Sequence, residues 1–317
     1  MTKEFPMRLI NGVLVVDKPE HITSYDVVRE IKKTAKRIKV GYLGTLDPLA
    51  TGVLPLLIGE ATKLAPFLEA AVKTYEAVIC LGITTDTQDR SGTALREADV
   101  SEFDASEKRL VEVLGLFSGT VRQMPPMFSA LKRQGIRLYE LARQGMEIER
   151  TRREVEIFGS EVLEIAVPYV TIRVECSKGT YIRTLAHDIG EVLGCGGHLW
   201  ALRRLGNGPF TVDQALSLDT VILELRKGTL NDHIMSLSEA LKNFPLVRVG
   251  EKEAQSIKQG RAVTGPTGGS SELGEDKLVR IGYAAGEGLV AVGRITGDGT
   301  RTMLKPVRVF HEGGASA

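Results

Sequence analysis

Apolar and polar positions along the chain form short strand-like or helical patterns separated by glycine and proline, and the first patterns predict a buried strand followed by a helix. The strand is the uninterrupted apolar run from Val13 to Val16. A helix is expected to begin near Tyr25, capped by Thr23 or Ser24, because the apolar residues after it recur at helical spacing. Its other side is rich in lysine and arginine, so this helix presents a basic face.

Similar patterns predict a mixed sheet with helices packed on it, in an α/β or α+β arrangement. Strands are expected at Val53 to Ile58, Thr74 to Leu81, Val155 to Leu163 and Tyr169 to Cys176, and helices at Glu60 to Val72, Lys108 to Phe117, Arg137 to Gln144 and Thr184 to Leu193. The character changes near Pro245, beyond which a small β-rich C-terminal domain is expected. Its elements are a helix at Glu251 to Lys258 and strands at Leu278 to Tyr283, Leu289 to Ile295 and Thr302 to Val309.

Composition bounds the class of protein without naming a partner. A chain of 317 residues with 43% hydrophobic content can bury a large core, and its length suggests about two domains. Lys and Arg total 41 against 40 Asp and Glu, so the net charge of +1 neither supports nor excludes a nucleic-acid partner. The N-terminal apolar run is far too short for a signal peptide or a membrane span, which favours a cytoplasmic location.

The cysteines and histidines raise the question of a metal site. The three cysteines are an odd number without short paired spacing, which favours reduced thiols. Cys176, His187, Cys195 and His198 are residue types that bind zinc, but only Cys195 and His198 have the close spacing of a zinc module. We therefore expect these side chains to pack in the core, and no metal site.

Common nucleotide and hydrolase motifs are missing from the sequence. The run from Gly59 to Lys63 lacks the spacing of a phosphate-binding loop, and Gly194 to Gly197 does not continue into a dinucleotide fingerprint. No Gly-x-Ser-x-Gly motif precedes His187 or His198. ATP, NAD and serine-hydrolase chemistry are therefore disfavoured.

Asp47 is the most unusual carboxylate in the chain. It lies in a loop between Gly44 and Gly52, and Pro48 directly after it restricts Asp47 to extended conformations. The glycines let the backbone approach a ligand closely. An aspartate that only accepts hydrogen bonds from backbone amides in a turn would look the same, and the residue types alone favour that structural interpretation.

Segments across most of the chain, in a constant order, match one known family. They are Asp17-Lys18-Pro19 with Thr23-Ser24, Lys39 to Lys63, Lys73-Thr74-Tyr75, Met127 to Lys132, Leu138 to Glu140 with Ala142 to Gly145, Cys176 to Arg183 and Leu202 to Leu205. Together they closely resemble the TruB family of bacterial tRNA pseudouridine synthases. Residues 288–295 are similar to the RNA-binding PUA domain at the C-terminus of that family, which is a weaker signal.

The resemblance implies an α+β pseudouridine-synthase fold, with a central mixed, largely antiparallel sheet flanked by helices in residues 1–244 and a β-barrel-like PUA domain in residues 245–317. It implies an enzyme that isomerises the T-loop uridine of tRNA, position 55 in tRNA convention, after flipping the base out. Asp47 falls on the catalytic carboxylate, which attacks or assists while the C1′–N1 bond breaks and uracil is rejoined through C5. The implied partner is the T-arm stem-loop of tRNA; we expect no cofactor and a monomer.

Further site residues follow from the same resemblance. Arg183 is the expected ion-pair partner of Asp47, where a guanidinium would lower the pKa of the carboxyl group and orient it. Tyr75 falls on the tyrosine that stacks on the target base. Tyr181, Leu202 and Lys18 complete the substrate-binding residues that the resemblance implies.

Two positions depart from the family pattern. Tyr42 and Leu43 stand where members usually have His-Thr, and we hypothesise that Tyr42 stacks on RNA in place of the imidazole. His21 stands where members usually have glycine, which puts the geometry of that loop in question. Because Lys18 and Pro19 are retained, this loop is still expected to support the active site.

The grip on RNA is expected to come from clustered cations, because phosphate contacts supply much of the affinity for nucleic acids. The candidates are Lys32, Lys33, Lys36 and Arg37; Lys132, Arg133 and Arg143; and Arg203 with Arg204. Each cluster alone is equally compatible with a solvated face. Two alternative functions stay open, namely a synthase acting on another RNA and a tRNA-binding folding chaperone that has lost catalysis through the changes at Tyr42 and Leu43.

Overall fold

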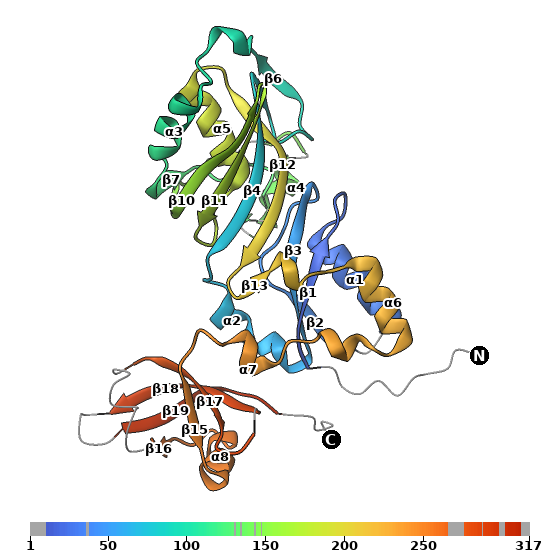
Figure 1. Ribbon diagram of the computed structural model, residues 1–317, viewed down its shortest axis with the longest axis vertical. Coiled ribbons are helices and arrows are strands. Elements are labelled where there is room, and N and C mark those ends of the chain that lie inside the picture. Colours follow the sequence, from blue (N-terminus) through green and yellow to red (C-terminus); the bar gives the residue numbers. More distant parts are fainter. Residues whose placement is uncertain are drawn as a thin grey trace.

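The computed structural model describes residues 11–35, 38–129, 131–133, 135–142, 144–146, 148–265, 276–286, 288–297 and 302–311. These form an elongated molecule, with a large sheet and its helices in the upper and middle parts of Figure 1 and a small curled sheet at the lower end. Within the described ranges, no helix is both long and apolar enough to cross a membrane.

A ten-stranded sheet forms the larger part of the protein. Its order is β14-β1-β3-β12-β4-β11-β10-β7, with β13 paired to β12 and β2 paired to β3. The strands are β1 (Gly12–Lys18), β2 (Val40–Tyr42), β3 (Ala50–Ile58), β4 (Lys73–Leu81), β7 (Gly119–Gln123), β10 (Arg153–Ala166), β11 (Tyr169–Cys176), β12 (Gly197–Asn207), β13 (Phe210–Thr211) and β14 (Leu216–Ser217). Neighbours run antiparallel except β1 with β14 and β3 with β12, so the expected mixed, largely antiparallel sheet is confirmed.

The helices agree with the sequence pattern in most places. They are α1 (Ser24–Thr34), α2 (Ala65–Leu68), α3 (Glu107–Gly115), α4 (Leu138–Ala142), α5 (Ile182–Leu193), α6 (Leu218–Lys227) and α7 (Leu237–Ala240), with 3-10 turns η1 (Gly59–Leu64), η2 (Val100–Glu102), η3 (Val212–Gln214) and η4 (Leu230–His233). Thr23 caps α1 in a reciprocal capping box with Asp26, as its position predicted. The long helix expected at Glu60 to Val72 is wrong: η1 and α2 replace it and end at Leu68.

The central strand β12 is not evident in the sequence pattern. Its pairing with β4 shifts register twice, between Leu199 and Ala201 and between Arg204 and Gly206. Each irregularity moves the following side chains to the other face, so the alternation with a period of two residues is broken. This strand nevertheless joins the two halves of the sheet, since it pairs with β3 on one side and β4 on the other.

Two apolar clusters cover the faces of the large sheet. The larger one joins strand residues to α1, α3 and α5, which Figure 1 shows beside the sheet. The second cluster lies on the opposite face of β1 and β3 and includes Phe210. It also contains Val292 and Phe310 from the C-terminal sheet, so the two parts of the protein share a core. Two small hairpins complete this part, formed by β5 (Ile83–Thr85) with β6 (Ala94–Glu97) and by β8 (Lys132–Arg133) with β9 (Ile136–Arg137).

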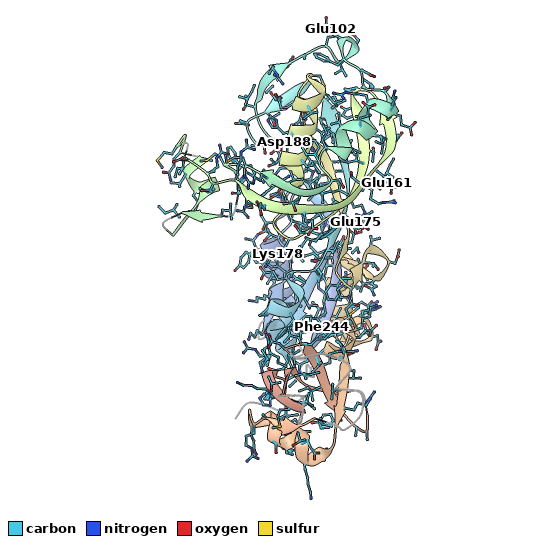
Figure 2. All side chains as sticks on the ribbon, turned by 90° about the vertical axis from the view of Figure 1, so that its left-hand side faces the viewer. Glu102, Glu161, Glu175, Lys178, Asp188 and Phe244 are labelled. Carbon is cyan, nitrogen blue, oxygen red and sulfur yellow. The ribbon has the colours of Figure 1, made fainter. Side chains whose placement is uncertain are left out.

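The C-terminal part is a five-stranded sheet with its own apolar cluster. The strand order is β15 (Leu246–Val249), β17 (Leu278–Tyr283), β18 (Leu289–Gly297), β19 (Thr302–Val309) and β16 (Val263–Thr264), and α8 (Glu251–Lys258) packs on it. Arg280 binds the segment that leads into this sheet, donating hydrogen bonds to the carbonyl oxygens of Phe244 and Ser238, each at 2.8 Å. The junction at Phe244 is labelled in Figure 2.

Candidate active site

Asp47 lies in a loop that neighbouring segments hold firmly. The carbonyl oxygen of Pro48 accepts hydrogen bonds from the backbone N–H of His21 at 2.8 Å and from Lys18 Nζ at 3.4 Å. Ser24 Oγ accepts a hydrogen bond from the backbone N–H of Leu46 at 2.8 Å. The β1–α1 segment therefore fixes the residues before and after Asp47, so the loop has its conformation before a substrate binds.

His21 explains how this loop keeps its shape without glycine. Its φ of 70° lies in the left-handed region, where glycine is the easy residue and other residues are uncommon. The backbone hydrogen bond to Pro48 holds it there, while the imidazole is 83% exposed. The substitution that put the loop geometry in question therefore costs local backbone strain and leaves the contact with Pro48 in place.

Arg183, in the first turn of α5, is the ion-pair partner of Asp47. Its Nε lies 2.9 Å from Asp47 Oδ2, so the expected ion pair is confirmed. The same guanidinium contacts Asp89 Oδ2 through Nη1 at 3.3 Å and donates hydrogen bonds to the carbonyl oxygens of Thr87 and Phe128 at 3.2 and 2.9 Å. The almost fully buried guanidinium of Arg183 thus joins α5 to three other segments of the chain, namely the loop of Asp47, the loop of Thr87 and Asp89, and the segment of Phe128.

Asp89 is a site residue that no sequence pattern predicted. Its side chain is 4% exposed, and besides Arg183 it accepts hydrogen bonds from Thr87 Oγ1 at 2.8 Å and from the backbone N–H of Ser91 at 3.0 Å. It sits in a polar loop after β5, where no periodic pattern separates a buried carboxylate from an exposed one. Asp89 contacts the Nη1 end of the guanidinium, which leaves Nε of Arg183 facing Asp47.

The pKa of Asp47 moves in the direction opposite to the one expected. Burial raises it, the charge of Asp89 raises it further, and the charges of Arg183 and Lys18 only oppose this. The guanidinium was expected from the sequence, but the loss of hydration around the carboxylate was not. The side chain still keeps 40% exposure, so one face of the carboxylate is open to a ligand.

Two cations proposed to touch substrate are buried instead. Lys18 has no exposed surface, and its Nζ donates to the carbonyl oxygens of Pro19 and Ile22 at 2.8 and 2.7 Å. Burial lowers the pKa of Lys18 to about 8. Arg204 is also fully buried, with Nε donating to the carbonyl oxygen of Val53 at 2.7 Å and Nη2 to that of Gly44 at 2.9 Å. Neither side chain therefore has surface exposed to a ligand, and both support the loop of Asp47; the substrate contact of Lys18 and the RNA contact of Arg204 stay predictions.

Tyr75 and Leu202 line the same side of the sheet. Tyr75 on β4 lies opposite Arg204 on β12, and Leu202 lies opposite Ala77 two positions along. Both side chains belong to the main apolar cluster, with exposures of 7% and 8%. Burial raises the pKa of the Tyr75 phenol, and the nearby guanidinium of Arg204 opposes that rise. The phenol is therefore neutral near pH 7.

Tyr181 and Tyr42 occupy different surroundings. Tyr181 is the residue before α5, where its backbone N–H donates to Gln123 Oε1 at 3.0 Å and its carbonyl oxygen accepts from Gln123 Nε2 at 3.2 Å. The guanidinium carbon of Arg153 lies 5.7 Å from the centre of the Tyr181 ring. Tyr42 ends β2 and is half-buried against the main apolar cluster.

The remaining cations fall into three situations. Lys32 and Lys33 are exposed on α1, and Lys33 forms an ion pair with Glu30 at 2.6 Å. Arg203 is 37% exposed and pairs with Asp17 at 2.7 Å on the face of the sheet opposite Arg204. Lys36, Arg37 and Arg143 lie outside the described residues, as do the side chains of Lys132 and Arg133.

The candidate zinc ligands do not gather. All three cysteines are buried free thiols, and His198 Nδ1 lies 2.8 Å from the carbonyl oxygen of Ile83. Across the described stretches of the chain, no group of three or more His, Cys, Asp or Glu side chains is arranged to hold a metal ion.

Solved structures share this architecture. The chain in "Crystal Structure of a Cbf5-Nop10-Gar1 Complex" is 29% identical with a TM-score of 0.73, covering 96% of this chain and 86% of that one. A second, in "Structure of H/ACA RNP bound to a substrate RNA containing 2'-deoxyuridine", is 26% identical with the same TM-score of 0.73 over the same shares of the two chains. The strand order, the arginine-bound aspartate and the curled C-terminal sheet thus define a protein of the pseudouridine-synthase fold with a PUA-like domain.

Sequence comparisons give the family. Residues 31–182 match the model "TruB family pseudouridylate synthase (N terminal domain)", and residues 183–242 match "tRNA pseudouridylate synthase B C-terminal domain". The chain belongs to the TruB family of pseudouridylate synthases, a family of isomerases. The tRNA pseudouridine synthase B of Geobacter sulfurreducens is 46% identical over 79% of this chain and 82% of its own length. That of Geotalea uraniireducens is 42% identical over 95% of this chain and 96% of its own length.

Proposed function

We propose that this protein converts uridine to pseudouridine in the T-loop of tRNA, at the position numbered 55 by convention, with Asp47 as the catalytic carboxylate. The observation that carries the proposal is the half-exposed Asp47 carboxylate bound to the buried guanidinium of Arg183. An aspartate that only stabilises a turn does not need a buried counter-ion that a second carboxylate holds in place. The relatives named tRNA pseudouridine synthase B match this chain over most of its length, which supports tRNA as the substrate.

The proposed reaction is an isomerisation that needs no cofactor. Asp47 promotes cleavage of the C1′–N1 bond, the detached uracil rotates, and C5 forms the new bond to C1′. The proton on C5 is then lost to solvent and N1 takes up a proton, so atoms and charge balance. Arg183 keeps the carboxylate ionised and oriented, against the burial that raises its pKa.

The substrate base has to leave its stack before Asp47 reaches it, at a cost of roughly a few kcal/mol. In our proposal Tyr75 and Leu202 form the apolar wall that receives the uracil, because they lie on neighbouring strands in one cluster. Tyr42 at the end of β2 and Tyr181 directly before α5 offer aromatic rings for stacking. Stacking on such faces offsets part of the cost of unstacking.

The grip on tRNA is proposed to come from exposed cations. Lys32 and Lys33 on α1 and Arg203 on β12 are available, although Arg203 would first have to exchange Asp17 for a phosphate. We also propose residues 1–244 as the catalytic domain and 245–317 as a PUA-like RNA-binding domain, supported by the separate five-stranded sheet and its own cluster. The expected setting is a monomer acting in the cytoplasm, where tRNA is found.

A tritium-release assay tests the proposal. Unmodified tRNA transcript carrying tritium at uracil C5 is incubated with wild type, with Asp47→Ala and with the control Asp213→Ala, which changes an exposed aspartate of η3. Wild type and the control should release tritium from the T-loop uridine, and Asp47→Ala should not. If wild type binds tRNA without releasing tritium, the tRNA-binding chaperone is favoured. If it releases tritium only from ribosomal or guide-selected RNA, that RNA is the substrate.

A further inference from the structure

Arg153 and Gln123 form a cross-strand pair beside the active site. Arg153 is the first residue of β10 and lies directly opposite Gln123, the last residue of β7. Facing residues of paired strands project to the same side of a sheet. Both side chains of this pair contact Tyr181. Gln123 forms hydrogen bonds with the backbone N–H and carbonyl oxygen of Tyr181, and the Arg153 guanidinium lies over the Tyr181 ring.

The position of Tyr181 places Arg153 close to the reacting groups. Tyr181 is two residues before Arg183, whose Nε is 2.9 Å from Asp47 Oδ2. Two residues of chain span at most about 7 Å, so the backbone of Tyr181 lies close to the Asp47–Arg183 ion pair. The turn from β11 into α5 carries the exposed Lys178, which Figure 2 labels where the upper lobe meets the middle of the molecule. Arg153 and Lys178 are thus two cations near the Asp47–Arg183 pair.

Arg153 differs from other arginines of the sheet in having no acidic partner. Arg122 on β7 contacts Glu154 at 3.2 Å, and Arg173 on β11 contacts Glu161 at 2.8 Å. Within the part of the chain that the structure describes, Arg153 forms no ion pair, and its recorded partner is the Tyr181 ring. A guanidinium that stacks on an aromatic face keeps its N–H donors in plane, where they match two oxygens of a phosphate.

We propose that Arg153 binds a phosphodiester of the substrate RNA strand next to the target uridine, with Tyr181 as its stacking support and Gln123 fixing the position of Tyr181. The inference rests on the proposed function and adds an anchoring residue to it. The Arg153 guanidinium is half-buried, positively charged and not paired with a carboxylate, so its ligand must be an anion. A phosphate is the anion that an RNA strand crossing Asp47 carries at every nucleotide.

The test is the salt dependence of tRNA binding by the full-length protein. Each phosphate contact contributes about 0.7–0.9 to the slope of log affinity against log salt, so Arg153→Gln should reduce the slope by about that amount and weaken binding about 10-fold at low salt. Arg122→Gln is the matched control, since it lies on the neighbouring strand, faces the other side and is paired with Glu154. It should leave the slope at the wild-type value.

Two further variants separate phosphate binding from a merely structural role. Arg153→Lys keeps the charge and should keep the slope while losing affinity, because an ammonium cannot bind two oxygens in plane. Tyr181→Leu removes the ring that supports the guanidinium and should resemble Arg153→Gln in slope and affinity. KM for tRNA should rise in Arg153→Gln while kcat at saturating tRNA stays within about twofold, as expected for uniform binding energy.

Specific results would overturn the inference. If Arg153→Gln has the slope of wild type and of Arg122→Gln while wild type still releases tritium, Arg153 binds no phosphate although the proposed function stands. If Arg153→Gln lowers Tm, its slope is compared with that of Arg153→Lys at a temperature where both are folded, and equal slopes refute the contact. Absence of both tritium release and salt-dependent binding in wild type would refute the proposed function itself.

Discussion

Replacing Asp89 by asparagine tests whether the charge behind Arg183 controls the carboxylate in front of it. Asp89 is 4% exposed, contacts Arg183 Nη1 at 3.3 Å and accepts a hydrogen bond from Thr87 Oγ1 at 2.8 Å. Breaking a buried ion pair by removing one partner costs about 3–5 kcal/mol, but Arg183 retains Asp47 and two carbonyl oxygens, so we expect about 2–3 kcal/mol for Asp89→Asn.

The effect on catalysis should exceed what stability alone explains. A displacement of Arg183 by about 1 Å would misplace Asp47 and reduce kcat by about 100-fold. The pH profile supplies a signature with a definite sign. In the proposed mechanism Asp47 acts in its ionised form, so activity should fall as the pH drops through the raised pKa of that carboxyl group. Because the Asp89 charge raises the pKa of Asp47, the acid limb of Asp89→Asn should move to lower pH even as the maximal rate falls.

The measurement is single-turnover tritium release from tRNA between pH 5 and 8, with urea unfolding of the same preparations. Asp86→Asn is the control, because this exposed aspartate belongs to the same loop and accepts a hydrogen bond from the backbone N–H of Thr93 at 2.8 Å, away from Arg183. It should keep the wild-type rate and profile. An unchanged rate in Asp89→Asn, or an acid limb moved to higher pH, would refute the role assigned to Asp89.

Three other substitutions address the surroundings of Asp47. Asp47→Asn should abolish tritium release, yet at pH 7 it should unfold in urea no earlier than wild type. The folded-state pKa of Asp47 is raised, so the protein loses stability as the pH rises through that pKa and the charged carboxylate destabilises the fold. Markedly earlier unfolding of Asp47→Asn would contradict this. Arg204→Gln should lower the free energy of unfolding by about 2–4 kcal/mol, through buried carbonyl oxygens left unpaired, without changing the salt slope of tRNA binding; a reduced slope would return Arg204 to the RNA surface. His21→Gly should raise the free energy of unfolding by about 0.5–1 kcal/mol by relieving the positive φ, and urea unfolding at a lower concentration than wild type would argue against strain there.

Asp47 and Arg183 could be predicted from the sequence, whereas the buried carboxylate that holds Arg183 in place could not. Asp47 and Arg183 are far apart in the chain, and only the family resemblance paired them; their 2.9 Å contact agrees with that pairing. Asp89 carried no signal, since a polar loop does not reveal which of its carboxylates is buried. The raised pKa of Asp47 was missed for the same reason, because desolvation depends on packing from segments distant in sequence.

Arg203 and Arg204 show how a local pattern misleads. They are adjacent in sequence, and as a charged pair they suggest a common surface. On β12 they point to opposite faces, where Arg203 meets Asp17 and Arg204 is fully buried against Val53 and Gly44. Recognising the strand would have separated them, but its two irregularities hide the alternation. The helix α8 lies where the pattern predicted, and so does β17, whose pairing with β18 has a single irregularity between Ile281 and Gly282.

The four-way contact of Arg183 also has an electrical consequence. One rigid plane touches Asp47, Asp89, and the carbonyl oxygens of Thr87 and Phe128. Phe128 lies in the segment between β7 and β8, far from Asp47 in sequence. A shift of that carbonyl by a few tenths of an ångström changes how the positive charge of Arg183 is shared among its four partners, and so changes the field at Asp47. The reactivity of the carboxylate is thereby coupled, through Arg183, to the conformation of a segment that is distant from it in sequence.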